Sequence, residues 1–200
     1  MRRKHTAGVV GAWQSWLLAF ALMLSVLRPG VLNADPLDGP LEVRSAFVTV
    51  DNGAYQLSAR IAYPLSEEIR RTLQDGISLG FDIEVQVQKQ RRFWTDATVA
   101  AYALHRELSW HAVRQHFVVR EAEHGELGSY ASLDQALAAI GSVDNWAVLV
   151  ESQLQPDASY QIGVRAILRR GTLSSAMRAL MWWSDSWQRA SDWYTWSLPR

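Results

Sequence analysis

The chain has 200 residues, with 20 lysine and arginine side chains, 20 aspartate and glutamate side chains, and no cysteine. The missing cysteine excludes disulfide bonds, thiolate metal sites, a cysteine nucleophile and lipid attachment at a lipobox cysteine. Four of the basic residues and none of the acidic ones lie in the first 34 positions, which leaves residues 35–200 with 16 basic against 20 acidic side chains, a net charge of −4. This acidic balance argues against nucleic acid as a general partner.

Residues 1–34 have the three-part pattern of a secretory signal peptide. Basic residues at positions 2–4 precede an uncharged, mostly apolar run over residues 8–27, and the segment ends on the small residue Ala34. Cleavage after Ala34 would release a soluble exported domain, residues 35–200. Without cleavage, residues 8–27 are just long enough to span a membrane and anchor the domain. Both interpretations predict a periplasmic domain, either free or anchored in the inner membrane.

The first element predicted after the leader is a β-hairpin. Residues 43–50 and 55–63 alternate between two faces, and Asp51-Asn52-Gly53 joins them. Asn-Gly supplies the two positive-φ residues of a tight hairpin turn. On this alternation, one face of the first strand carries Val43, Ser45, Phe47 and Thr49.

A short helix follows the hairpin. Ser66 is a predicted N-cap for residues 67–74, which bury Ile69 and Leu73 and end before Gly76. The acidic residues of its first turn are favourably placed against the helix dipole.

The middle of the chain is dominated by alternating runs. Residues 77–94 form the longest, with apolar odd positions from 81 to 87 and polar even ones. Residues 98–110 and 117–120 are two further strands, whereas the acidic, glycine-bearing residues 121–129 are expected to form an exposed loop. Period-two patterning with one polar face is typical of an antiparallel sheet with one side in water.

The second predicted helix opens at a capping box, residues 132–135, and ends at Gly141. The remaining predicted strands cover residues 146–151 and 160–168. The fold class is therefore mostly β: an antiparallel β-sandwich of about seven strands with two short helices, within a single domain over residues 35–200. A single curved sheet covered by the helices is the alternative.

Residues 172–200 form a tryptophan-rich C-terminal segment, expected to be helical and then extended. Half of the ten tryptophans of the chain lie between positions 182 and 196. Three interpretations are open: a segment folded back as core, a partner-binding surface, since tryptophan supplies much of the energy at hot spots, or a contact with the membrane interface. The candidate partner-binding residues are Trp182, Trp187, Trp193 and Trp196.

Basic residues end two of the long predicted strands. The candidate anion-binding residues are Lys89, Arg91, Arg92, Arg169 and Arg170. If the two strands are neighbours, these side chains would form one basic rim that could meet an anionic group. The alternative is that they are solvated charges that protect strand ends.

No motif of catalysis is present: there is no G-x-S-x-G, no H-E-x-x-H and no glycine loop that could cradle a phosphate. His105, His111, His116 and His124 lack the i, i+4 spacing of a helical zinc site and are interpreted as ordinary surface histidines. We therefore predict no catalytic residues, no metal site and no cofactor.

Five short motifs resemble, in order, a proteobacterial family known as domain of unknown function 4390. They are LQDGISL at 73–79, RRFWTD at 91–96, LSWHAV at 108–113, ALAAIG at 136–141 and DWYTWSL at 192–198. The likeness covers most of residues 41–198. It implies an exported, cysteine-poor protein and, through sensor-kinase gene neighbourhoods, a link to signalling. It carries no activity and no site residues.

The function expected from these features is that of a non-enzymatic binding domain of the cell envelope. Its partner would be a protein or another envelope component, with no nucleic acid, and membrane contact would occur only through residues 8–27 if the leader is uncleaved. One alternative is a small-ligand binder or hydrolase with a cleft near His111 and the basic strand ends. Another is a membrane-anchored structural component of the envelope.

Overall fold

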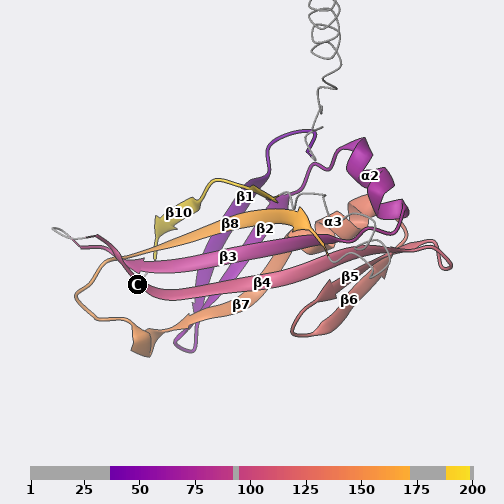
Figure 1. Cartoon of the computed structure of the whole chain (residues 1–200). Helices are drawn as coiled ribbons and strands as arrows, with labels where there is room; N and C mark the ends of the chain where they lie inside the picture. Colours follow the sequence, from indigo (N-terminus) through magenta and orange to yellow (C-terminus); the bar gives the residue numbers. More distant parts are fainter. Residues whose placement is uncertain (1–36, 92–94, 172–187, 199–200) are drawn as a thin grey trace, which may run out of the picture. The chain divides into compact units, whose positions relative to one another are not determined.

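The computed structural model of the chain describes residues 37–91, 95–171 and 188–198, which belong to one compact unit, Asp35–Arg200. These residues form two antiparallel β-sheets and two α-helices (Figure 1). The predicted fold class, a mostly β antiparallel protein with two short helices, is confirmed. The described residues contain ten strands instead of about seven, because three of the strands are short and lack a clear alternating pattern. The predicted leader, residues 1–34, lies outside the described residues.

The described strands and helices follow one another along the chain in a simple order. They are β1 (Glu42–Asp51), β2 (Ala54–Ala62), α2 (Glu67–Gln74), β3 (Leu79–Lys89), β4 (Ala97–His111), β5 (His116–Glu121), β6 (Gly125–Tyr130), α3 (Leu133–Gly141), β7 (Ser142–Val150), the 3-10 turn η1 (Glu151–Gln153), β8 (Tyr160–Arg170), β9 (Gln188–Ala190) and β10 (Tyr194–Ser197). The smaller sheet has the order β1-β2-β7. The larger has the order β10-β8-β3-β4-β5-β6, and β9 also pairs with β8. Neither helix of the described residues has the length and hydropathy of a membrane span.

Both sheets contribute to one apolar core. The odd-numbered side chains Phe81, Ile83, Val85 and Val87 of β3 are completely buried, as the alternation predicts. β3 pairs with β4 on one side and β8 on the other, and Figure 1 shows it between them at the centre of the larger sheet. Leu57 and Val148 of the smaller sheet belong to the same core. The opposite face of β3 is therefore the polar face of the larger sheet.

The predicted hairpin is confirmed, but one detail of its first strand is wrong. Asn52 and Gly53 have φ angles of 50° and 75°, as the tight turn requires. The register shifts between Val43 and Ser45, where a β-bulge adds one residue to β1. Val43 is therefore buried, whereas Phe47 is 54% exposed and does not share its face. A bulge exchanges the two faces of every residue that follows it.

The expected loop over residues 121–129 is also wrong, because residues 125–130 form β6 and pair with β5. Gly125, with a φ angle of 80°, closes the turn between the two strands. β6 lies at the edge of the sheet and none of its side chains is buried. An edge strand with two exposed faces has no apolar alternation, so its composition is that of a loop.

Both predicted helices are confirmed. The Ser66 hydroxyl accepts a hydrogen bond from the Ile69 amide at 3.4 Å, and the Ser132 hydroxyl accepts one from the Gln135 amide at 3.3 Å. These N-caps satisfy amides that would otherwise lack a partner in the first turn. α3 continues directly into β7, which begins at Ser142, four residues earlier than the predicted strand.

Candidate functional site

The two groups of basic residues that the sequence suggested as one rim lie at opposite ends of the larger sheet. β3 and β8 are neighbours, but they are antiparallel: Leu79 is opposite Arg170, and Lys89 is opposite Tyr160. At about 3.4 Å per residue, ten residues separate the two groups by roughly 34 Å. The prediction of a single basic rim is therefore wrong, because the alternation that identified the strands says nothing about their relative direction. Arg92 lies outside the described residues.

Lys89 and Arg91 line an open cleft of about 680 Å³ together with residues 155–159. The Lys89 ammonium group donates a hydrogen bond to the side-chain oxygen of Gln155. Asp157 also lines the cleft and places a carboxylate beside the two cations. The surface is thus mixed in charge rather than simply basic.

At the other end of the sheet, Arg169 is held in an ion pair on the polar face. Its Nε and Nη2 atoms donate to the Asp82 carboxylate at 2.7 and 3.1 Å, and His105 Nδ1 lies 2.8 Å from the same carboxylate. Burial alone would raise the pKa of Asp82, but the hydrogen bonds from Arg169 and His105 outweigh it and hold that pKa below its ordinary value. Arg170 ends β8 half-buried. Arg169 therefore stabilises the sheet itself, by joining β8 to β3 through its ion pair with Asp82.

The Asp82→Asn substitution is expected to lower the stability of the protein by about 1–2 kcal/mol at pH 7, because the three hydrogen bonds to the charged carboxylate are weakened or lost. Since the pKa of Asp82 is depressed in the folded state, its contribution is present above the unfolded pKa of about 4 and is lost as the pH falls through the folded pKa. The difference between wild type and variant should therefore shrink below about pH 4.

Urea unfolding at pH 7 and near pH 3 measures this difference. Asp144→Asn is the matched control, because the Asp144 carboxylate is 59% exposed in its pair with Arg60 and should contribute little at either pH. A stability difference for Asp82→Asn that is the same at both pH values would contradict the prediction.

The described tryptophans of the C-terminal segment have two different environments. Trp196 lies opposite the buried Ile162 and packs against the core, with its ring centroid 5.7 Å from that of Tyr194. Trp193 is half-buried on the polar face, where the Arg165 guanidinium carbon lies 4.6 Å from the indole centroid. Trp182 and Trp187 lie outside the described residues.

Trp193 borders a groove on the polar face of the larger sheet, which we call the amide groove. It has a volume of about 190 Å³ and is lined by Gln86, Gln88, Gln161, Gly163, Trp193 and Thr195. The strand register explains how these residues meet: Gly163 lies between Gln86 and Thr195, and Gln161 is opposite Gln88. The alternation of β3 identified its glutamines as a polar face, but only the pairing of β10 with β8 brings Trp193 to them.

The carboxamides in and beside the groove are hydrogen-bonded to one another. Gln88 Nε2 donates to Gln86 Oε1 at 3.3 Å, and Gln90 Nε2 lies 3.5 Å from Gln161 Oε1. Each carboxamide has two N–H donors and an oxygen with two lone pairs. One bond each leaves most of this capacity for a ligand.

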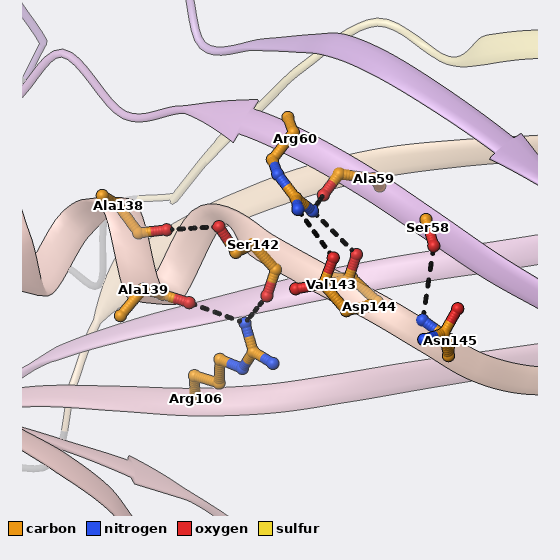
Figure 2. Close-up of polar contacts among 10 residues, drawn as sticks. All are labelled: Ser58, Ala59, Arg60, Arg106, Ala138, Ala139, Ser142, Val143, Asp144 and Asn145. Carbon is orange, nitrogen blue, oxygen red and sulfur yellow. Dashed lines mark hydrogen bonds and ion pairs between the residues drawn. The ribbon is translucent and has the colours of Figure 1, made fainter.

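A second polar cluster, around Arg106, lies inside the protein. The Arg106 side chain is 7% exposed and pairs with Glu121, 9% exposed, at 2.9 Å. Its Nη1 atom also donates to the carbonyl oxygens of Ala139 and Ser142, at the junction of α3 and β7 (Figure 2). The same atom donates to the carbonyl oxygen of Ile140. The sequence carried one signal for this cluster: Arg106 interrupts the apolar positions of its strand. Its contacts are one buried carboxylate and three backbone carbonyl groups of the protein, so it acts as a structural anchor.

The rings of His111 and His124 contact residues that are close to them in the sequence. The His111 Nδ1 atom accepts a hydrogen bond from the Arg114 amide at 3.3 Å within the β4–β5 turn, and His124 Nδ1 lies 2.7 Å from Glu121. His111 is remote along the sheet from the Lys89 cleft, since it lies at the other end of β4. Within the described ranges, no three histidine, aspartate or glutamate residues are grouped so that they could hold a metal ion.

The fold and the site together define a two-sheet antiparallel β domain that carries an aromatic, amide-lined groove on its polar face. The sequence model of the domain of unknown function family DUF4390 matches residues 39–197. The chain therefore belongs to this family, as its motifs suggested. No curated protein and no solved structure matches it significantly.

Proposed function

We propose that the protein is an exported, non-enzymatic binding domain of the cell envelope and that the amide groove is its contact surface. The signal-like leader supports export. A role in binding is supported by the grouping of an indole ring with several carboxamides in one hollow, because binding sites combine apolar contact area with a few well-placed polar groups.

The observation that carries the proposal is the position of Trp193. This indole lies on the water-facing side of the sheet, whereas the neighbouring Trp196 packs against the core. Tryptophan is enriched at the contact surfaces of proteins, since its side chain offers a large area at a low cost in conformational entropy. The two interpretations of the C-terminal segment therefore apply to different residues: Trp193 belongs to the surface, and Trp196 packs against the core.

A photo-crosslinking experiment in living cells tests the proposal. A photoreactive amino acid at Thr195, which lines the groove, is expected to give a covalent adduct with an envelope component. The same amino acid at Thr49, an exposed position on the smaller sheet, is the control and should give none. The Trp193→Ala substitution should abolish the Thr195 adduct. An adduct of equal yield from both positions, or none from Thr195, would count against a contact surface at the groove.

The two tryptophans should differ in their effect on stability. Trp193→Ala removes a cation–π contact with Arg165, expected to contribute about 0.5–1 kcal/mol. Trp196→Ala removes a ring from the core and should cost about 2–3 kcal/mol, which corresponds to a fall in Tm of roughly 4–12 °C for a domain of this size. Thermal unfolding followed by circular dichroism measures both, and a larger fall for Trp193→Ala would place that ring in the core instead.

A further inference from the structure

We infer that the ligand of the amide groove is an uncharged carbohydrate chain. This inference rests on the proposed function, because it names the class of ligand for the same surface. The charges of the lining groups, the position of the indole ring and the size of the hollow support it.

The hydrogen-bonding groups that line the groove are uncharged. They are the carboxamides of Gln86, Gln88 and Gln161 and the hydroxyl of Thr195. A charged pair borders the groove on the same face: Arg165, which lies over the Trp193 ring, is paired with Glu84, with Arg165 Nε 2.6 Å from Glu84 Oε2. An ionic ligand would therefore lose its hydration without meeting a free counter-charge.

Hydroxyl groups are the natural partners of such a lining. A hydroxyl donates one hydrogen bond and accepts up to two. A carboxamide matches both, because its oxygen accepts and its NH₂ group donates. Adjacent hydroxyls on a sugar ring can thus engage the row formed by Gln88 and Gln161, which lie opposite each other in the register. A ligand with only one polar atom would use one of these carboxamides and would leave the other without a partner on the ligand.

The indole ring of Trp193 supplies the apolar part of the site. Arg165 covers one of its faces, so a ligand can pack only on the other or at the ring edge. The ring edge lies close over Gly163: a Cβ atom there would be 3.1 Å from Trp193 Cε3. The glycine therefore lets the indole approach the sheet surface. An aromatic ring beside hydrogen-bonding groups suits the C–H face of a sugar ring, which is apolar while its edge is polar.

The dimensions favour one sugar unit in the hollow. Its volume, about 190 Å³, is smaller than the roughly 300–1,000 Å³ of pockets that enclose drug-sized ligands. A chain can continue out of the groove, because the hollow lies on the face of the sheet. A peptide added as a strand would instead use the backbone of a sheet edge.

Titration of the purified full-length protein with chitotetraose, cellotetraose and maltotetraose tests the inference, with binding followed by calorimetry and by the indole N–H resonances. Saturable binding of at least one of these is expected. Trp193→Ala should weaken it at least tenfold, and Gln88→Ala or Gln161→Ala at least threefold. Gln56→Ala, a half-buried glutamine on β2 of the smaller sheet, is the matched control and should leave the affinity unchanged.

The outcomes separate the inference from the proposed function. If none of the three oligosaccharides binds while the photoreactive residue at Thr195 still gives its adduct, the carbohydrate inference is overturned and the contact surface stands. The same holds if mass spectrometry identifies the adduct as a polypeptide. If neither binding nor an adduct is found, both are overturned. Binding that Trp193→Ala leaves unchanged would also overturn the carbohydrate inference.

Discussion

Replacing Arg106 by methionine is expected to lower the free energy of unfolding by about 3–5 kcal/mol, the usual cost of breaking a buried ion pair from one side. The substitution leaves the Glu121 carboxylate, 9% exposed, without its guanidinium partner. It also removes the donor that serves the carbonyl oxygens of Ala139, Ile140 and Ser142 at 3.2, 2.7 and 2.8 Å. Methionine has a similar volume, so the effect reports lost polar contacts rather than a cavity.

The size of the effect follows from where Arg106 lies. It reaches from β4 of the larger sheet to the point where α3 becomes β7 of the smaller one, as Figure 2 shows. The last carbonyl groups of a helix have no partner within it, and those of α3 are satisfied in part by this side chain. Arg106 thus ties the two sheets together at one junction.

Urea unfolding of Arg106→Met measures this loss. Adding Glu121→Met is expected to recover part of it, because no buried carboxylate then lacks its guanidinium partner, but the α3 carbonyls lose their donor in both variants. Arg60→Met is the matched control at the same junction. The Arg60 pair with Asp144 is more than half exposed, so its loss should cost about 1 kcal/mol or less. Equal losses for Arg60→Met and Arg106→Met would contradict the role of burial.

Replacing Gly141 by alanine is expected to destabilise the protein by at least about 2 kcal/mol and to lower Tm by roughly 4–8 °C. A Cβ atom at Gly141 would lie 2.2 Å from the backbone oxygen of Ile61. Backbone of β2 cannot turn aside as a flexible side chain can, so α3 would have to move away from the sheet. The better helix propensity of alanine offsets only about 1 kcal/mol of this cost.

Differential scanning calorimetry of Gly141→Ala measures the change, and Gly39→Ala is the control. A Cβ atom at Gly39 would meet the Pro64 ring at an ordinary 3.6 Å, so this variant should unfold within about 1 °C of the wild type. If the Gly141 variant is as stable as the Gly39 variant, the backbones of α3 and β2 cannot be in close contact.

Local signals in the sequence were sufficient for most individual elements. Asn52 and Gly53 predict the hairpin turn because few residues adopt positive φ angles without strain. Ser66 and Ser132 predict helix starts because their hydroxyls accept hydrogen bonds from amides three residues ahead. The alternation of β3 predicts its buried face. In each case the physical cause lies within a few residues of the chain.

The candidate site was predicted only in fragments. Trp193 and the basic strand ends were recognised as residues that could bind, but the partners of Trp193 were not. Gln88 and Gln161 are 73 positions apart, and nothing near either of them indicates that they lie opposite each other. The sequence shows Arg106 as a break in the apolar face of its strand. It does not indicate the partners of Arg106, which come from α3, β5 and β7.

The sequence by itself thus determined the β class of the domain, the bounds of both helices and the buried face of the central strand, because period, caps and turn residues act locally. The tertiary structure alone decided three things. Antiparallel pairing placed Lys89 and Arg169 at opposite ends of the sheet, the bulge in β1 turned Phe47 outward, and the pairing of β10 with β8 formed the amide groove. Strand order, direction and register depend on contacts between distant residues, which no local pattern encodes.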